Sequence, residues 1–432
     1  MEKKFLTIII PVFNTEIKLL KKCLQSVSRL NPKDVQIIII DDFSNTKINL
    51  FLKKIKRKNL KVYRNSKNKG ISFSRNFGIK LSNSKYITFV DADDYIFMDE
   101  FRSIKNAIIK EEPDLAVTKF DTNYFQITEN RNFKDKNFQF KGEKRIIYDF
   151  SKEEFKPYWH FEAVWCLFFK RDFLLKNRLR FENKAFRNED QEYVVKSFFL
   201  SGKTLILNKR FYFYRLHNSN IRYTNQISQK NMFNGNIRLI KNLFIFFKKK
   251  KYLYSVNNFP LSTIKDLILS SIPFAYKIKR EKLIEMNVLI RQIQKKFKKN
   301  RIQIPKLNFL KINNTFDLFF RNGINLKKIK SIYIYCAFES SIPIIHFFNK
   351  KRVKINGIID TNEQLKGRFF FNIKVYSLKE MIKLKKKNNV LILITHPEKN
   401  TFLKIKKNVL KAGFLSSNII NIGYKKIFNL YN

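Results

Sequence analysis

The chain has 432 residues, of which 44% are hydrophobic, and it carries a formal net charge of +53. This length predicts two or three domains, and the composition excludes a disordered chain. The charge favours anionic partners, but the lysines are spread along the whole sequence instead of being clustered, so we expect no nucleic-acid-binding protein.

The sequence carries no mark of an exported or membrane-spanning chain. Cys23, Cys166 and Cys336 lie far apart among apolar residues, which is typical of buried thiols in a reducing compartment. No cleavable leader follows Met1, and no apolar stretch approaches the roughly 18 residues that a membrane-spanning helix needs. We therefore expect a cytoplasmic protein.

The first 120 residues alternate strand and helix patterns. Continuous apolar runs, several of them rich in β-branched residues, predict buried strands at residues 5–13, 35–40, 60–63, 86–90 and 114–120. Helical patterns between them predict helices after Asn14-Thr15, at residues 70–81 and at residues 101–110. This alternation indicates a parallel sheet with helical crossovers.

Polar clusters follow three of these predicted strands. They are Asn14-Thr15, residues 41–44 (DDFS) and residues 91–94 (DADD). Ligands of parallel sheets bind beyond the carboxyl ends of the strands, where side chains from neighbouring strands converge. The spacing therefore predicts one carboxylate-lined site.

The rest of the chain divides into parts of different character. Helical patterns cover residues 162–176 and 188–202, and residues 204–214 are typical of a strand pair. A lysine-rich, helical stretch without chemical motifs extends from about residue 225 to 320, and strands at 331–336, 355–359 and 390–394 begin a new alternation. We expect three domains, at residues 1–222, 223–328 and 329–432.

Four motifs in order resemble the family 2 glycosyltransferases of the GT-A fold. They are residues 8–14 (IIIPVFN), 41–44 (DDFS), 68–70 (NKG) with 74–78 (SRNFG), and 90–94 (VDADD). The resemblance continues through Trp165 and Glu189-Asp190, so that it covers about half of the chain. It implies an α/β nucleotide-diphospho-sugar transferase domain, followed here by a helical middle region.

The last hundred residues resemble the small Rossmann-like domains attached to sugar-modifying enzymes. Such domains usually carry a glycine-rich turn after the first strand, whereas the corresponding residues 336–341 (CAFESS) contain no glycine. A close backbone approach to a pyrophosphate is therefore disfavoured. We expect a structural or acceptor-handling role for this domain instead of dinucleotide binding.

The resemblance assigns residues 91–93 to the DxD motif of these enzymes. It implies that Asp93 binds a divalent metal ion on the donor diphosphate, Mn²⁺ or Mg²⁺, and that Asp91 contacts the ribose, with Asp94 in support. Carboxylates suit these hard cations. The alternative is a cluster of aspartates that caps a helix.

The donor nucleotide is assigned to the loops at the other strand ends. By resemblance Asp41 and Asp42 contact the base and ribose, Arg75 faces the nucleotide, and Pro11 and Asn14 shape the loop beneath it. A carboxylate can accept the imide N–H of uracil or an exocyclic amine, so either residue could contact the base, and the expected donor is a UDP-sugar. The alternatives are a turn-forming aspartate pair and an ordinary surface arginine.

The acidic pair Glu189-Asp190 follows Asn188 and opens a predicted helix. In the family, a pair at this place supplies the base that deprotonates the acceptor, and we expect Asp190 to do so, with Glu189 second. The alternative is an acidic first turn favoured by the helix dipole. His217 is a candidate third metal ligand or, alternatively, a polar loop residue; Trp165 and Trp159 could stack on a sugar or pack in the core.

These assignments predict an inverting transferase that moves a sugar from a nucleotide diphosphate to a hydroxyl group by metal-assisted single displacement. The expected acceptor is a surface glycan, such as a capsule or lipooligosaccharide chain, or its lipid-linked form. The alternatives are an inactive transferase-like scaffold, a basic anion- or nucleic-acid-binding protein and a sugar nucleotidyltransferase. The last usually has a glycine-rich basic loop after the first strand, which residues 11–14 lack.

Residues 272–299 mix apolar and basic side chains at helical spacing. Such a helix can lie in a membrane interface, which predicts peripheral contact with the inner face of the membrane. A basic helix packed against the catalytic domain has the same pattern, so both interpretations stand.

Overall fold

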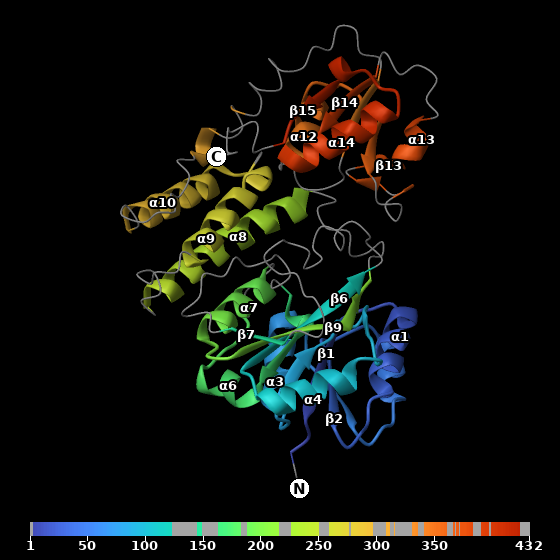
Figure 1. Cartoon of the computed structure of the whole chain (residues 1–432), viewed down its shortest axis with the longest axis vertical. Coiled ribbons are helices and arrows are strands. Elements are labelled where there is room, and N and C mark those ends of the chain that lie inside the picture. Colours follow the sequence, from blue (N-terminus) through green and yellow to red (C-terminus); the bar gives the residue numbers. More distant parts are fainter. Residues whose placement is uncertain are drawn as a thin grey trace. The chain divides into compact units, whose positions relative to one another are not determined.

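The computed structural model shows two compact units (Figure 1). They are Met1–Leu216 with Ile245–Pro260, and His217–Phe244 with Leu261–Asn432. The residues described are 3–122, 145–148, 163–182, 188–215, 226–249, 259–275, 278–296, 308–311, 315, 331–335, 341–360, 366–367, 369–370, 372–382, 390–396 and 399–423. The three predicted domains, with boundaries at residues 222 and 328, stay a prediction.

The first unit is built on one mixed sheet of nine strands, as far as the chain is described. Its parallel half has the order β3-β2-β1-β4, with β1 at Leu6–Val12, β2 at Val35–Asp41, β3 at Leu60–Arg64 and β4 at Tyr86–Phe89. The second half continues from β4 with β8 (Leu167–Lys170), β6 (Leu115–Thr122), β9 (Thr204–Tyr214) and β5 (Tyr95–Ile96), and β7 (Arg145–Tyr148) pairs with β9.

Helices connect these strands. They are α1 (Ile17–Ser28), α2 (Thr46–Lys53), α3 (Ile71–Leu81), α4 (Phe101–Glu111), the one-turn η2 (Val164–Cys166), α6 (Arg171–Lys176) and α7 (Glu189–Leu200). Helix α1 buries Leu20, Cys23, Leu24 and Val27, because these residues fall on one face at helical spacing. The parallel sheet with helical crossovers that the sequence predicts is therefore confirmed.

Two local predictions in this unit are wrong. Residues 162–176 do not form one helix, because Leu167–Lys170 is a strand between β4 and β6. Its Leu-Phe-Phe run is buried on both faces, a pattern that a short strand and a buried helix share. Residues 204–214 form the single long strand β9 instead of a strand pair.

Helix α3 packs against β1 and β2 at very short range. A Cβ atom placed on Gly78 would lie 2.4 Å from Cγ2 of Ile9, which is closer than two carbon atoms can approach. Only glycine permits this distance between helix and sheet. The short distance fixes the depth at which α3 lies on the sheet.

The second unit contains helices and a second sheet. The helical elements are α8 (Gln226–Lys249, partly in the first unit), α9 (Phe259–Ser270), η5 (Pro273–Ala275), α10 (Arg280–Lys296) and η6 (Phe309–Lys311). The sheet has the order β12-β13-β11-β10-β14-β15, and only β12 is antiparallel to its neighbour. Counting its parallel strands along the chain, this order is 3-2-1-4-5, as in doubly wound α/β folds.

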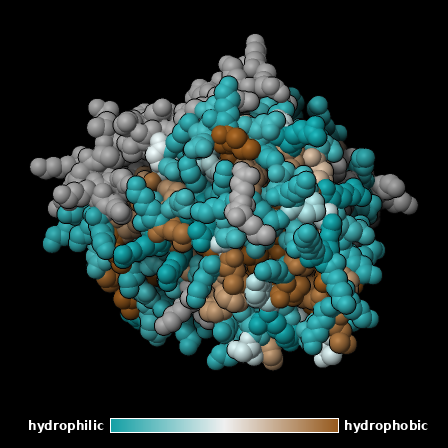
Figure 2. Space-filling view, turned by 90° about the horizontal axis from the view of Figure 1, so that it is seen from below, coloured by the Kyte–Doolittle hydropathy of each residue, from teal (hydrophilic) through white to brown (hydrophobic). Residues whose placement is uncertain are grey.

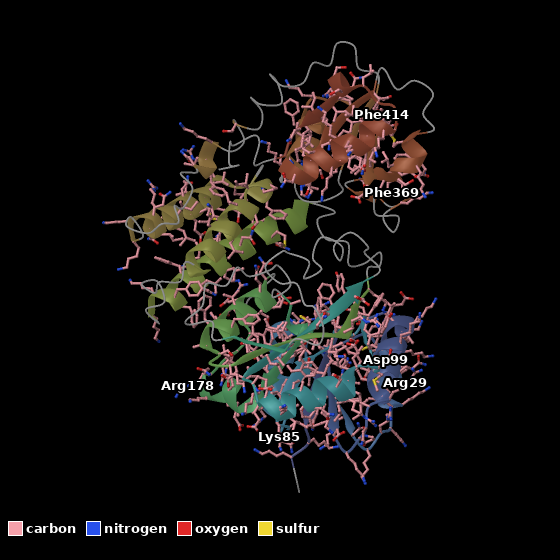
Figure 3. All side chains as sticks on the ribbon, in the orientation of Figure 1. Arg29, Lys85, Asp99, Arg178, Phe369 and Phe414 are labelled. Carbon is pink, nitrogen blue, oxygen red and sulfur yellow. The ribbon has the colours of Figure 1, made fainter. Side chains whose placement is uncertain are left out.

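The strands of this sheet are β10 (Ser331–Tyr335), β11 (Gly357–Asp360), β12 (Phe369–Phe370), β13 (Ile373–Ser377), β14 (Val390–Ile394) and β15 (Ile419–Asn421). The helical elements beside them are α12 (Ile342–Lys350), α13 (Leu378–Ile382), α14 (Lys399–Lys411) and η10 (Ser416–Asn418). Phe414 is buried in the core of this sheet, whereas Phe369 is exposed (Figure 3). A second α/β sheet near the C-terminal end is present, as predicted, and its assignment to a separate domain stays a prediction.

Helix α10 occupies most of the stretch for which membrane contact is predicted. It buries an apolar stripe that includes Leu283, Met286 and Ile290. That stripe packs inside the second unit, whereas Ile284 and Val288 on the same helix are exposed, so membrane contact and packing against the catalytic domain both stay predictions. Among the described residues no helix combines the length and the apolarity that crossing a membrane requires. Figure 2 shows a face of the molecule that is mostly hydrophilic with separate hydrophobic patches.

Candidate active site

The carboxyl ends of four adjacent strands form the candidate site. Backbone hydrogen bonds continue the ladder just past the strands, from Asp42 N to Val12 O (2.8 Å), from Asn65 N to Asp41 O (2.9 Å) and from Val90 N to Ile9 O (3.0 Å). Residues that follow β1, β2, β3 and β4 therefore lie along one edge of the sheet, as the sequence predicts.

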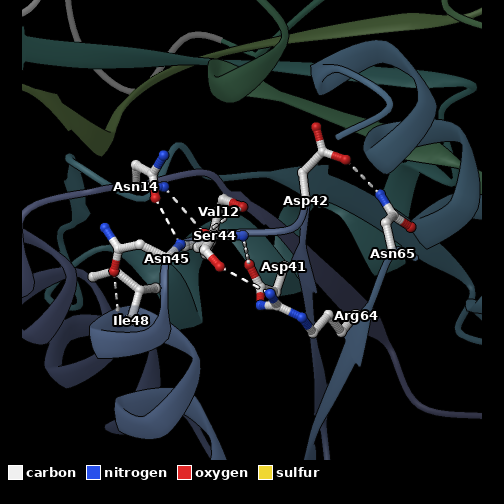
Figure 4. A network of polar contacts seen from close by, with 9 residues as sticks. All are labelled: Val12, Asn14, Asp41, Asp42, Ser44, Asn45, Ile48, Arg64 and Asn65. Atoms are coloured by element: carbon white, nitrogen blue, oxygen red, sulfur yellow. Dashed lines mark hydrogen bonds and ion pairs between the residues drawn. The ribbon is translucent and has the colours of Figure 1, made fainter. Parts of the chain in front are cut away.

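Asp41 is held inside this edge by an arginine (Figure 4). Its carboxylate is 1% exposed, forms an ion pair with Arg64 and accepts a hydrogen bond from Ser44 N at 2.9 Å. Arg64 Nη2 also donates to Ser44 O at 2.8 Å, and the guanidinium lies 4.9 Å from the ring centroid of Phe43. Asp41 and Arg64 thus hold the loop that follows β2.

Asp42 uses both carboxylate oxygens within the protein. Oδ1 accepts from Asn65 Nδ2 at 2.7 Å and from Lys69 N at 2.8 Å, and Oδ2 accepts from Gly70 N at 2.7 Å. Gly70 has a φ of 86° and is the N-cap of α3. Asp42 therefore ties the start of α3 to β2, in agreement with the turn-forming alternative. Contact of Asp41 or Asp42 with a base stays a prediction.

Asn14 links the ends of β1 and β2 (Figure 4). Its backbone N–H donates to Ser44 Oγ at 3.0 Å, and its Oδ1 accepts from Asn45 N at 2.8 Å. Pro11, in β1, lies opposite Ile40 of β2. It follows Ile9, the last residue of β1 that pairs with β4. Pro11 therefore lies inside β1 and Asn14 in the loop that follows it, and their role beneath a nucleotide stays a prediction.

Residues 91–94 alternate between accessible and buried side chains. Asp91 and Asp93 are partly exposed, whereas Ala92 and Asp94 are buried. Oδ2 of Asp94 accepts a hydrogen bond from the Tyr212 hydroxyl at 2.6 Å, and Oδ1 accepts from Arg215 N at 2.7 Å. Asp94 thus anchors the loop at residues 91–94 to β9. Asp91 and Asp93, the two residues predicted to face the donor, are the partly exposed ones of this loop.

Arg75 joins two parts of the site, at Asp91 and Glu189, that are 98 positions apart in the sequence. Its guanidinium is 2% exposed, with Nη2 3.1 Å from Asp91 Oδ1 and Nη1 3.2 Å from Glu189 Oε1. It lies 5.3 Å from the ring centroid of Phe181, which stacks on Tyr193. Arg75 is therefore a buried cation between the loop after β4 and the start of α7, not a surface arginine.

Burial and charge oppose each other in this group. Burial raises the pKa of Asp91 above its usual value, because the neighbouring Arg75 offsets this effect only in part and Asp93 adds a second negative charge. Burial alone would lower the pKa of Arg75, but the charges of Asp91, Glu189 and Asp190 raise it. The guanidinium therefore stays charged and compensates for the surrounding carboxylates.

Glu189 and Asp190 begin α7, as predicted. Glu189 is bound to Arg75, whereas Asp190 Oδ1 accepts from Gln191 N at 2.9 Å and is partly exposed. The ion pair fixes Glu189 in position, and Asp190 is the next residue of the same helical turn. The assignment of the base itself stays a prediction.

Some predicted site residues cannot be placed, and some important residues escaped prediction. His217 and Trp159 lie outside the described residues. Trp165 is 9% exposed and stacks on Tyr212, so it packs in the core. Sequence reasoning missed Arg64, Asn65, Tyr212 and Arg215; Arg64 and Asn65 offered a signal, as the two polar residues that follow the strand predicted at residues 60–63.

The donor set suits a divalent cation that is held jointly with a substrate. Within the described residues no group of three or more His, Cys, Asp and Glu side chains is arranged to hold a metal ion. Mg²⁺ is usually bound through one or two carboxylates together with substrate phosphates. Asp91 and Asp93 are two residues apart and both partly exposed, so they could supply the two carboxylates of that mode.

Residues 7–177 match the family described as glycosyl transferase family 2. Among similar proteins, glycosyltransferase GlyA of Streptococcus pneumoniae is 28% identical over 227 residues, which is 50% of this chain and 31% of GlyA. The uncharacterized glycosyltransferase MJ1057 of Methanocaldococcus jannaschii is 26% identical over 240 residues, or 54% of this chain and 78% of that protein. The minor teichoic acid biosynthesis protein GgaB of Bacillus subtilis is 27% identical over 50% of this chain and 24% of its own length. This chain therefore matches about a third of GlyA and about a quarter of GgaB.

Solved structures share the fold. The crystal structure of S. aureus TarS 1-349 in complex with UDP aligns with a TM-score of 0.50 at 15% identity, over 74% of this chain and 92% of TarS 1-349. The resemblance to family 2 glycosyltransferases of the GT-A fold, predicted from the four motifs, is confirmed for residues 7–177.

Proposed function

We propose that the family 2 glycosyltransferase domain at residues 7–177, completed by α7 and β9, moves a sugar from a nucleotide diphosphate to a hydroxyl group of a glycan. The observation that supports this most strongly is the buried guanidinium of Arg75, which contacts both Asp91 and Glu189. A donor-binding loop and a base-bearing helix must lie side by side for transfer, and this ion-pair network holds them there.

The proposed donor is a UDP-sugar. TarS 1-349, which shares the fold, was crystallised in complex with UDP, which supports this class of donor. Asp93 and Asp91 would hold Mn²⁺ or Mg²⁺ on the diphosphate, with His217 as the predicted third ligand. A divalent ion there supplies charge neutralisation for the departing diphosphate.

Asp190 is the proposed base. It accepts the proton of the acceptor hydroxyl while the hydroxyl oxygen bonds to the anomeric carbon, and the bond from that carbon to the diphosphate oxygen breaks. A single displacement of this kind inverts the anomeric centre. Glu189 keeps the start of α7 in place through Arg75 and leaves Asp190 as the carboxylate beside the acceptor.

The proposed acceptor is a growing surface glycan, such as a capsule, lipooligosaccharide or teichoic acid chain. The name of the similar protein GgaB, a minor teichoic acid biosynthesis protein, supports a surface-polymer pathway. Intermediates of such polymers are commonly lipid-linked, so we also propose that the chain works in the cytoplasm at the inner face of the membrane.

The test is a donor panel. Purified full-length chain is incubated with UDP-, GDP- and CDP-sugars with Mn²⁺ or Mg²⁺, with and without EDTA, and donor hydrolysis or transfer is measured. We expect turnover with one UDP-sugar, lost in EDTA and lowered at least about a hundredfold by Asp93→Ala. Asp99→Ala removes an exposed aspartate from the same region and should leave turnover unchanged.

Two results would overturn the proposal. The first is a folded chain that turns over none of the donors, which would favour the inactive-scaffold alternative. The second is turnover that neither EDTA nor Asp93→Ala reduces, which would exclude metal assistance through the DxD motif.

A further inference from the structure

Helix α14 has an outer face that mixes leucine and lysine. Its inner face buries Ile405 and Val409 in the core of the second unit. On the outside, Leu403 is 50% exposed and Leu410 is 40% exposed. They are seven residues apart, which places them on the same side of the helix two turns apart, with exposed Lys407 between them.

The charge of this helix has one sign. Helix α14 contains no acidic residue, and it carries five lysines: Lys399, Lys404, Lys406, Lys407 and Lys411. Just beyond the helix, Leu415 is 48% exposed and adds a third apolar side chain. No aspartate or glutamate occurs anywhere from residue 399 to residue 432 of the sequence.

No other described helix combines these two properties to the same degree. On α10 the exposed Ile284 and Val288 lie beside the acidic residues Glu281 and Glu285. The exposed large apolar residues of α2, α3, α4, α6 and α8 occur singly, as Leu50, Ile71, Ile109, Leu175 and Ile245. A general excess of lysine explains the charge of α14 but does not explain why leucines are exposed among the lysines.

We propose that the outer face of α14 binds a membrane surface that contains anionic lipids. The lysines are attracted to the lipid phosphates, and the exposed leucines enter the boundary between headgroups and acyl chains, where they leave water. This deepens the membrane contact of the proposed function by naming the surface that makes it. It does not depend on sugar transfer, so vesicle binding and transferase activity are measured separately.

The test is flotation of the full-length chain with vesicles of phosphatidylcholine, with or without 30% phosphatidylglycerol. We expect binding to the anionic vesicles only, weakened by salt. The variant Lys404→Glu/Lys407→Glu/Lys411→Glu should bind at least about a hundredfold more weakly, since each lysine near an anionic surface contributes about fivefold. The variant Leu403→Ser/Leu410→Ser keeps the charge and should bind about tenfold more weakly.

The matched control is Arg291→Glu/Lys295→Glu/Lys296→Glu on α10, where all three side chains are exposed. It changes the net charge by the same amount and should bind within about threefold of the parent chain, a small loss from screened long-range attraction. Equal losses in both triple variants would overturn the proposal in favour of diffuse attraction. An unaffected leucine variant would overturn it in favour of a surface for any polyanion, including nucleic acid. Absence of binding by the parent chain would overturn it outright, whether or not the donor panel shows turnover.

Discussion

The two sheets of this chain share a strand arrangement but differ at their carboxyl ends. In each, the first parallel strand lies between the second and the fourth, as β3-β2-β1-β4 in one unit and β13-β11-β10-β14 in the other. In each, the second strand ends in a buried aspartate, Asp41 or Asp360. Strand order alone therefore does not distinguish the two edges.

The two edges differ in the polar contacts that surround them. At the edge of the first sheet, arginines reach in from neighbouring elements, with Arg64 on Asp41 and Arg75 on Asp91 and Glu189. At the edge of the second sheet, the side-chain hydroxyl of Thr395 donates a hydrogen bond to the backbone carbonyl of Tyr335 at 3.1 Å. The comparison teaches that two sheets with the same order of parallel strands can carry different polar networks at their edges.

The largest effect on the edge of the first sheet is expected when the buried cation Arg75 is removed. In Arg75→Met, Asp91 and Glu189 lose their shared partner in a place that water hardly reaches, and we expect the free energy of unfolding to fall by about 3–5 kcal/mol. Urea unfolding measures this. Arg29→Met, at an exposed arginine (Figure 3), is the control. Equal losses in the two variants would show that the ion-pair network does not organise the edge.

Removing the proposed base should leave the fold and change the chemistry. We expect Asp190→Asn to lower the rate of transfer about 10³-fold, because the amide cannot take the acceptor proton. UDP affinity, measured by calorimetry, should stay within about twofold. If Asp190→Asn kept a tenth or more of the parent rate, another group would be the base, and the same measurement on Glu189→Gln would follow.

A smaller effect is expected where the carboxylate serves the backbone. In Asp42→Asn one oxygen that accepts from Lys69 N, Gly70 N or the Asn65 amide is replaced by an NH₂ group, so that two donors face each other. We expect a loss of about 1–3 kcal/mol in unfolding free energy. The backbone amides of Lys69 and Gly70 should also exchange their hydrogens faster in this variant. Unchanged exchange there would mean that Asp42 does not hold the start of α3.

The smallest effect is expected at the second sheet. Asp360→Asn should leave the rate of sugar transfer within about twofold, since the proposed chemistry lies at the edge of the other sheet. Steady-state transfer under the conditions of the donor panel measures it. A tenfold loss would place the edge of the second sheet in the reaction and would erase the contrast between the two units.

The sequence predicted the strands and the convergence of their ends for a physical reason. Strands buried on both faces are continuous apolar runs, and residues 5–13 and 35–40 have no competing helical pattern. The run at residues 167–170 fits a helix equally well locally, and only its pairing with β4 and β6 makes it a strand.

Contacts between distant parts of the sequence were beyond prediction. The hydroxyl of Tyr212 reaches Asp94 across 118 positions, and Arg75 reaches Glu189 across 114. The hydrogen bonds that the Asp42 carboxylate accepts depend likewise on the position of the loop before α3. Local patterns identify which residues are polar and near a strand end, but the partner of each follows from the complete fold.

Gly78 gives one further consequence of the close packing of α3 on β1. It lies one helical turn after Arg75, so the distance between helix and strand at Gly78 and Ile9 also sets how deep the arginine lies. Substitutions at the exposed Lys80 can accumulate independently of other positions. A larger residue at position 78 is expected to persist only together with a smaller one at position 9. Substitutions at positions 78 and 9 should therefore occur together among related sequences, because a larger residue at position 78 alone should be removed by selection.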